Sequence, residues 1–297
     1  VTGTSTLGYP TSILDNCTPS LSNEVTHSSS NFNTGCPGSY TYTRTWTVTD
    51  ACDNFSTSTQ TVIVRDTMKP VISVLPEVTY YKGNNCEADT SVTGASTLGY
   101  PTRIHDNCTD SASCEVTHSS SIFTSPCTGA YTYTREWRVT DACGNYTTAT
   151  QTVNVLDTVK PVISVLSTVT YYKNESCLAD TTVAGPSTLG YPTRIHDNCT
   201  DSASCVVTHT SYDFTPICTG SYSYNREWRV TDSCGNYTTA VQTVYVLDKR
   251  VPTFNVLESV TYYKNTNCEA DTTVTGTTTL GYPTSILDNC TPSLSNE

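Results

Sequence analysis

Hydrophobic and polar residues alternate along residues 131–157, "YTYTREWRVTDACGNYTTATQTVNVLD". Tyr131, Tyr133 and Trp137 fall on one face of this alternation, while threonines and charged residues fall on the other. A period of two is typical of a β-strand with one buried face, and the polar stretch 141–145 divides the run into two strands. The pattern therefore predicts a long β-hairpin that turns at 141–145.

Shorter runs elsewhere in the chain carry the same signals. They are rich in β-branched and aromatic residues, which favour strands, and no stretch shows a convincing helical period. Several short strands separated by turn signals are typical of a two-sheet sandwich. We therefore predict an all-β fold.

The whole pattern repeats every 91 residues. The motif "STLGYP", or its variant "TTLGYP", begins at Ser5, Ser96, Ser187 and Thr278. The three tryptophans keep the same spacing, and so do the arginine that precedes each of them and the cysteine that follows. A fixed period of this length indicates a tandem array of one structural unit.

A longer period of 273 residues, three times 91, lies on top of the first. The sequence "TRIHDNCTDSASC" occupies 102–114 and 193–205, whereas "TSILDNCTPSLSN" occupies 11–23 and again 284–296. The units thus read A-B-B′-A, and the last of them resembles the start of another triplet. We expect the chain to be a periodic segment of a longer protein.

Composition narrows the class of protein. Apolar residues make up 36% of the chain, so a 91-residue unit buries only a thin core and needs covalent support. Fifteen cysteines in register supply it, and with this composition they favour disulfides in an oxidising, extracellular setting. The net charge of −12 argues against nucleic acids and anionic membranes as partners. No transmembrane run is present, so this segment is not expected to insert into a membrane.

The motifs "TDACGN" at 140–145 and "LDTVKP" at 156–161 resemble those of HYR and HYR-like extracellular repeats. The resemblance covers each unit almost end to end, with one departure, "LDKRVP" at 247–252. That family, common in long surface proteins of Bacteroidetes, implies immunoglobulin-like β-sandwiches that serve as stalks, adhesin shafts or filament material. It implies no chemistry.

The resemblance and the turn signals together predict four domains. Residues 1–69 form an immunoglobulin-like unit without its first strands, and residues 252–297 form the start of a further unit. The two complete units are expected at 70–160 and 161–251.

Candidate catalytic residues have simpler structural explanations. His27, His118 and His209 recur in "VTH" without a catalytic frame around them. His105 and His196 are replaced by leucine in the A-type units, which a catalytic residue would not tolerate. Zinc held by His105, Cys108, Cys114 and Cys143 is an alternative to disulfides, and disulfides are favoured. We predict no enzyme activity and no cofactor.

Two further sets of charged residues lie in or beside the predicted hairpin. Asp106, Asp110 and Asp141 occupy loops at one end of the sandwich, where oxygen ligands could bind Ca²⁺ at a domain junction. Solvated turn carboxylates are the favoured interpretation. Arg135 falls on the aromatic face, where we expect it to stack on the rings beside it and to pair with a carboxylate. Its equivalents Arg44 and Arg226 should do the same.

Attached sugars are expected on this hydroxyl-rich chain. The Asn-x-Ser/Thr motif occurs at Asn16, Asn54, Asn107, Asn145, Asn174, Asn198, Asn236 and Asn289. A motif resembling the O-glycosylation signal of Bacteroidetes occurs at Thr67, Ser111, Thr158, Thr181, Ser202 and Thr272. Glycans at such positions would shield exposed strand edges from aggregation.

The sandwich also leads to a disulfide scheme. Loops at the two ends of a strand lie at opposite ends of a domain, so Cys127 and Cys143 are too far apart to bond. Loops at the same end should meet within one repeat. The expected bonds are Cys86–Cys127, Cys108–Cys143, Cys177–Cys218, Cys199–Cys234 and Cys17–Cys52.

Cys114 and Cys205 are left over by this scheme, and they occur only in the B-type units. An odd cysteine in a secreted chain suggests either a bond outside its own domain or a free thiol. We favour contact between chains or between coiled turns, with unpaired thiols as the alternative.

The function predicted from these observations is a non-enzymatic extracellular filament or stalk, whose partners are further copies of itself and whose surface carries glycans. Two alternatives stay open at this point. One is an adhesin that binds a carbohydrate or protein ligand. The other is a short subunit that polymerises by strand exchange into a pilus-like fibre.

Overall fold

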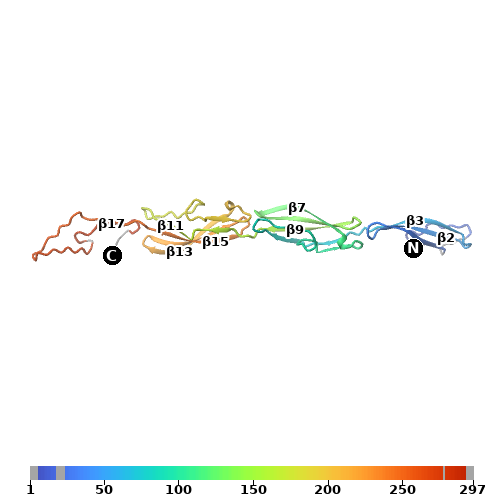
Figure 1. Cartoon of the computed structure of the whole chain (residues 1–297), viewed down its shortest axis with the longest axis horizontal. Helices are drawn as coiled ribbons and strands as arrows, with labels where there is room; N and C mark the ends of the chain where they lie inside the picture. Colours follow the sequence, from blue (N-terminus) through green and yellow to red (C-terminus); the bar gives the residue numbers. More distant parts are fainter. Residues whose placement is uncertain (1–5, 18–23, 277, 292–297) are drawn as a thin grey trace. The chain divides into compact units, whose positions relative to one another are not determined.

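The computed structural model describes residues 6–17, 24–276 and 278–291. Strands dominate it, and the helical elements among the described residues are two single 3₁₀ turns, η1 (Ser111–Ser113) and η2 (Ser202–Ser204) (Figure 1). The chain divides into two compact units. Unit 1 comprises residues 1–80, 89–125 and 131–155, and unit 2 comprises 81–88, 126–130 and 156–297.

Unit 1 begins with a three-stranded antiparallel sheet. Its strands are β1 (Val25–Thr34), β2 (Tyr40–Thr49) and β3 (Phe55–Val64), in that order. Trp46, in the middle of β2, is buried at 5% exposure. The alternation of threonine with aromatic residues along β2 thus produces the two-faced strand that the sequence predicts.

The second sheet system of unit 1 contains the predicted hairpin. Its four-stranded sheet has the order β5-β9-β8-β7, and a two-stranded sheet, β4-β6, accompanies it. The bounds are β4 (Val71–Ser73), β5 (Glu77–Tyr81), β6 (Arg103–His105), β7 (Glu115–Cys127), β8 (Ala130–Thr140) and β9 (Tyr146–Leu156). Strands β8 and β9 pair from Tyr131↔Val155 to Thr140↔Tyr146, so the predicted hairpin and its turn are confirmed.

Unit 2 contains the same arrangement 91 residues further along. Its four-stranded sheet is β11-β15-β14-β13, with a two-stranded sheet β10-β12 and a further pair β16-β17. The bounds are β10 (Val162–Ser164), β11 (Thr168–Tyr172), β12 (Arg194–His196), β13 (Val206–Cys218), β14 (Ser221–Thr231), β15 (Tyr237–Leu247), β16 (Thr253–Asn255) and β17 (Thr284–Leu287). Strand β11 pairs in parallel with β15, whereas the other pairs in this sheet are antiparallel.

The core lies on the inner face of each four-stranded sheet. Trp137 is 1% exposed, and Val139, Val153 and Val155 are fully buried, while the residues between them on β8 and β9 are more exposed. The inward face predicted from the alternation is therefore confirmed. The described residues form an all-β structure of the immunoglobulin-like sandwich type.

The repeated "TLGYP" motif supports this core. Gly99 has a positive φ of 89°, and a Cβ there would lie 2.8 Å from Nη1 of Arg135. Tyr100, the next residue, packs edge-on against Trp137 with ring centroids 5.6 Å apart. The motif recurs because its glycine leaves room for the arginine and its tyrosine covers the tryptophan.

Arg135 is buried, with 1% of its surface exposed. Its guanidinium carbon lies 5.8 Å from the ring centroids of both Tyr133 and Trp137, which confirms the predicted stacking. The predicted carboxylate partner is wrong. Nη2 donates to the carbonyl of Thr90 at 2.7 Å, and Nη1 donates to Oε1 of Gln151 at 3.3 Å. Nη2 also donates to the hydroxyl of Tyr133 at 3.0 Å, so neutral acceptors take the place of a carboxylate, and Nε is buried without a partner.

The two arginines equivalent to Arg135 also donate to neutral acceptors. Arg226 donates to the carbonyl of Thr181 at 2.9 Å, and Arg44 donates to Gln60 at 3.3 Å. The ion pair among the described residues is Arg250–Glu175 at 2.7 Å, which is exposed.

Candidate functional site

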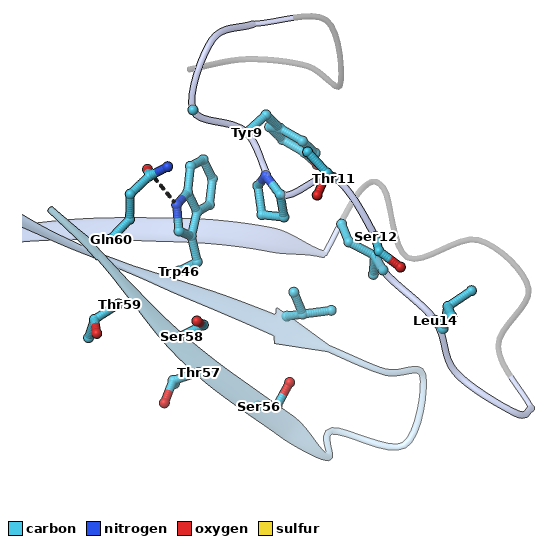
Figure 2. A pocket seen from close by; sticks show the side chains of 14 residues that line it. Tyr9, Thr11, Ser12, Leu14, Trp46, Ser56, Thr57, Ser58, Thr59 and Gln60 are labelled. Atoms are coloured by element: carbon cyan, nitrogen blue, oxygen red, sulfur yellow. Dashed lines mark hydrogen bonds between the residues drawn. The ribbon is translucent and has the colours of Figure 1, made fainter. Parts of the chain in front are cut away.

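A pocket of about 490 Å³ opens beside the three-stranded sheet of unit 1. Residues 8–14, Trp46, Val48 and residues 56–60 line it, and Figure 2 shows Tyr9 and Trp46 beside strand β3. In the next repeat, the residue equivalent to Gln60 is Gln151, whose amide donates to the carbonyl of Leu75. That amide thus has an acceptor within the chain in the next repeat, and we assign the pocket no ligand.

The four disulfides join successive repeats. They are Cys36–Cys143, Cys86–Cys199, Cys127–Cys234 and Cys177–Cys290, with Cα–Cα distances of 5.0 to 5.2 Å. The sequence separations are 107, 113, 107 and 113 residues, each longer than one 91-residue repeat. Every bond therefore reaches from one repeat into the next.

The five predicted pairings, which lay within single repeats, are therefore wrong. Six predicted cysteines are bonded, but to other partners: Cys86, Cys127, Cys143, Cys177, Cys199 and Cys234. Cys36 and Cys290 are bonded although the scheme omitted them. Four predicted cysteines are unbonded in the described structure: Cys17, Cys52, Cys108 and Cys218. The scheme failed because the loop at the far end of one repeat meets the near-end loop of the following repeat.

In three places where loops of successive repeats meet, a glycine lies against a cysteine of the following repeat. Gly129, two residues after Cys127, has a φ of 98°, and a Cβ there would lie 2.6 Å from Cβ of Cys199. The turn that carries Cys127 can approach Cys199 this closely only because the position has no side chain. Gly38 and Gly220 hold the equivalent positions against Cys108 and Cys290.

An aspartate triad lies beside the cysteines in each unit. In unit 1 it comprises Asp66, Asp106 and Asp141, and in unit 2 Asp157, Asp197 and Asp232. In each triad, one carboxylate oxygen from every residue lies within 4.8 Å of the other two. Asp66 and Asp157 follow the last strand of one repeat, and the other members belong to the next. Asp110, which the sequence suggested, is not a member and instead precedes η1.

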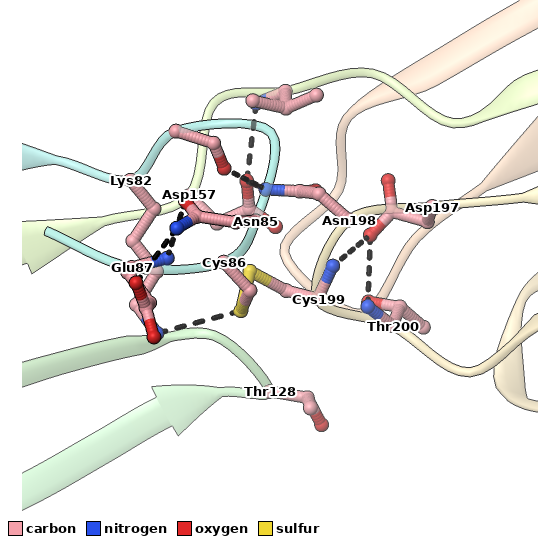
Figure 3. Close-up of a disulfide and its surroundings, with 12 residues drawn as sticks. Lys82, Asn85, Cys86, Glu87, Thr128, Asp157, Asp197, Asn198, Cys199 and Thr200 are labelled. Carbon is pink, nitrogen blue, oxygen red and sulfur yellow. Dashed lines mark hydrogen bonds between the residues drawn. A yellow bond between two sulfur atoms is a disulfide. The ribbon is translucent and has the colours of Figure 1, made fainter.

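Backbone amides hold these carboxylates in place. In Figure 3, Oδ2 of Asp197 accepts from the amides of Cys199 and Thr200 at 3.0 and 2.8 Å. Oδ1 of Asp157 accepts from the amide of Val159 at 3.1 Å and from Nδ2 of Asn198 at 3.2 Å. The side chains are thus oriented by the chain around them before any ligand is present.

The triads also contain buried oxygens without partners. Oδ2 of Asp157 and Oδ1 of Asp197 are buried and accept no hydrogen bond. The same is true of Oδ1 of Asn198, whose amide nitrogen donates to Asp157. Unit 1 repeats this at Oδ2 of Asp66 and Oδ1 of Asp106. Buried carboxylate oxygens normally accept hydrogen bonds, so the two unpartnered oxygens that recur in both triads require an explanation.

Asp106 stays ionised despite its position. Burial raises its pKa, but hydrogen bonds from the amides of Thr109 and Cys108 lower it more, and its net pKa is below the usual value. Unit charges about 5 Å apart repel by roughly 1 kcal/mol in water and by several times more at lower dielectric. The triad is therefore a concentrated negative charge.

The histidines pack against the tryptophans. His118 lies edge-on to Trp137 with centroids 4.8 Å apart, and His209 lies in the same way on Trp228. Burial, followed by the charge of Arg135, lowers the pKa of His118; His209 is shifted downward by burial and Arg226. These contacts are those of packed side chains.

Cys114 and Cys205 are buried thiols, each 8% exposed, without a bonded sulfur. Burial, together with nearby aspartates, raises the pKa of both thiols, so they remain protonated. A bond to another chain would require these residues to become exposed, and unpaired thiols are the simpler hypothesis. The zinc alternative is wrong as stated, because Cys143 is bonded to Cys36.

The predicted glycosylation positions differ in accessibility. Thr67, Ser111, Thr158, Ser202 and Thr272 are exposed, as are Asn16, Asn54, Asn107 and Asn174, whereas Thr181, Asn145, Asn198, Asn236 and Asn289 are half-buried. Nδ2 of Asn145 donates to Asp141 at 2.8 Å, and Nδ2 of Asn236 donates to Asp232 at 2.8 Å. Sugar on these two amides would compete with the hydrogen bonds that hold the triads, so the exposed positions stay the better predictions.

Comparisons with known proteins give only distant likenesses. No family model matches the chain, and no curated protein matches it either. Similar solved structures include the extracellular domain of protocadherin GammaB4, at 13% identity and a TM-score of 0.30, covering 76% of this chain and 45% of that one. Protocadherin gammaB7 EC3-6 gives 13% identity and a TM-score of 0.33, with 82% and 71% covered. Drosophila N-cadherin EC1-4 gives 11% and 0.27, with 73% and 59% covered.

This chain spans less than half the length of the protocadherin GammaB4 structure. With TM-scores this low we draw no functional conclusion from the likeness. The disulfides themselves indicate an oxidising environment, outside the cell or on its surface. Among the described residues, no helix combines the length and apolarity needed to cross a membrane.

Proposed function

We propose that the protein is a non-enzymatic structural element of an extracellular filament or stalk, built from tandem immunoglobulin-like repeats. The observation that carries the proposal is the disulfide register. The separations 107 and 113 alternate along the chain, so each repeat is bonded to the next by side chains as well as by the backbone. A catalytic or single-ligand domain has no need of this, whereas an array under tension does.

The closed loops overlap, because Cys86 lies inside the loop closed by Cys36–Cys143, and the later bonds continue the series. The shortest covalent path from end to end runs along residues 1–36, 143–177 and 290–297, roughly a quarter of the chain. At 3.3–3.6 Å per extended residue, this path spans about 270 Å, against about 1,000 Å for the whole backbone.

Single-molecule stretching tests this proposal. The oxidised chain, held by its two ends, should stop extending at about 270 Å even after its domains unfold. The reduced chain should extend to about 1,000 Å. The variant Cys114→Ser/Cys205→Ser is the matched control and should behave like the wild type, since neither residue is bonded. An oxidised chain that extends to the reduced length would contradict the proposal.

The HYR-like resemblance of "TDACGN" and "LDTVKP" supports the same role and the membership of a longer surface protein. Further copies of the repeat are the partners that this architecture favours. Attachment of glycans to the exposed hydroxyls remains part of the proposal.

A further inference from the structure

We propose that each aspartate triad binds one calcium ion. The inference concerns the sites themselves and goes beyond the structural role proposed above. It begins from the two buried, unpartnered oxygens that both triads share: Oδ2 of Asp66 and of Asp157, and Oδ1 of Asp106 and of Asp197. Asp106, Asp157 and Asp197 are 8%, 5% and 7% exposed, so water does not solvate these carboxylates freely.

The charges of the triads are not balanced by basic side chains. No ion pair of the described residues involves a triad aspartate. The lysines that follow, Lys69 and Lys160, lie over the rings of Tyr146 and Tyr237, at 5.8 and 6.0 Å. Three carboxylates without a counter-ion at such short range call for a cation from solution.

The donor set selects the class of cation. All three side chains offer carboxylate oxygen, and Oδ1 of Asn198, also buried and unpartnered, can add an amide oxygen in unit 2. An all-oxygen set suits hard cations such as calcium and magnesium and not zinc or copper, which favour nitrogen and sulfur.

Coordination preference favours calcium over magnesium. Calcium accepts about six to eight oxygen ligands at about 2.3–2.6 Å in a flexible geometry, so three carboxylates and further oxygens can share one ion. The triad oxygens lie within 4.8 Å of one another, so small adjustments bring all three round one ion. Magnesium demands near-octahedral geometry, keeps several waters and usually takes only one or two carboxylates.

The position of the triads gives the ion a consequence. Asp157 follows β9, while Asp197 and Asp232 come from the repeat that begins with β10, and Asp197 lies two residues from the disulfide-bonded Cys199. A calcium ion would join the end of one repeat to two loops of the next, beside the disulfides that already join them. In that position calcium would restrict the motion of one repeat against the next without changing the distance between them.

Calorimetric titration of the chelator-treated full chain with calcium chloride tests the proposal. The variant Asp106→Asn/Asp197→Asn should bind two fewer calcium ions per chain than the wild type, or bind them at least ten-fold more weakly. Asparagine keeps an oxygen that can accept the backbone hydrogen bonds, so the variant should still fold. The matched control, Asp110→Asn/Asp201→Asn, changes the same charge at exposed positions outside the triads and should bind as the wild type does.

Thermal unfolding provides the second readout. Calcium should raise the unfolding temperature of the wild type and of the control but not that of the triad variant. In chelator the triad variant should unfold somewhat earlier than the wild type, because the ionised carboxylate of Asp106 is the stronger acceptor for the amides of Thr109 and Cys108. The quantity to compare is therefore the shift that calcium causes in each protein. A second variant, Asp66→Asn/Asp157→Asn, should repeat this result if the first does not fold. Equal calcium binding by the triad variant and the wild type, or equal stabilisation by magnesium, would overturn the proposal.

Discussion

A few positions in this protein are fixed by contacts between residues that are distant in the sequence. Gly129 illustrates this, because its positive φ and its approach to Cys199 both exclude a side chain. Gly144, in the β8–β9 turn, also has a positive φ, of 87°, but a Cβ there would meet nothing within 4 Å. The two glycines thus separate the effect of backbone conformation from that of a close contact.

We expect Gly129→Ala to destabilise the protein more than Gly144→Ala. Both substitutions force an L-residue into the left-handed region, at about 1–2 kcal/mol. Only the first also drives a methyl group into Cys199, which should add about 1–3 kcal/mol as overpacking does. Urea unfolding of the oxidised chain measures both, with Gly144→Ala as the control. Equal losses of unfolding free energy in the two variants would contradict this prediction, because Cys199 would then move away from the added methyl group at no cost.

At the scale of elements, each four-stranded sheet carries a histidine opposite its tryptophan. In unit 2, His209 on β13 pairs in register with Trp228 on β14. The strand pairing fixes the distance, and the downward pKa shift of His118 and His209 follows from burial and from the arginine behind the ring. Both histidines are therefore neutral in the folded protein at neutral pH.

This arrangement predicts a dependence of stability on pH. The pKa of each histidine in the folded protein lies below its value of about 6.5 in the unfolded chain. At pH values between these two pKa values, the unfolded chain therefore binds more protons than the folded protein. The stability is therefore complete above pH 6.5 and decreases as the pH falls towards the folded pKa. Urea unfolding at pH 7.5, 6.5 and 5.5, in chelator, should show this loss in the wild type and a smaller one in His118→Phe/His209→Phe. An unchanged pH slope in the variant would contradict the argument.

The elements themselves were the part most open to prediction from sequence. The alternation at 131–157 specified a hairpin and its inner face because strand periodicity is a local property of the chain. The disulfide pairings could not be predicted from the sequence, for a reason that is particular to repeat arrays. Cys52 and Cys143 occupy the same position in successive repeats, so the sequence does not reveal which copy provides the partner of Cys36. Asp66 was missed for the same reason, since its partners lie in the following repeat.

At the scale of the whole molecule, the unbonded cysteines follow the same register as the bonded ones. Cys218 and Cys268 lie 91 residues after Cys127 and Cys177, which are bonded 107 and 113 residues further on. If another copy follows at the 273-residue period, these spacings fall on its Cys52 and its Cys108. The array is then continued by the same bonds, whether by peptide linkage or by assembly.

We therefore expect two specific disulfide-linked peptides in the native material. Digestion without reduction, followed by mass spectrometry, should yield Cys52 linked to Cys218 and Cys108 linked to Cys268. Cys114 and Cys205 should be recovered as thiols, which makes them an internal control. Full alkylation of Cys218 and Cys268 before reduction would show that the register ends within this chain.

The overlap of the closed loops has one more consequence, which concerns hydrolysis of the backbone. From residue 36 to residue 290, every peptide bond lies within at least one loop closed by a disulfide. A protease that cuts any single one of these bonds leaves the two pieces covalently attached, so the cut neither shortens the chain nor releases a fragment. The protein can thus be cut at an isolated point and remain whole.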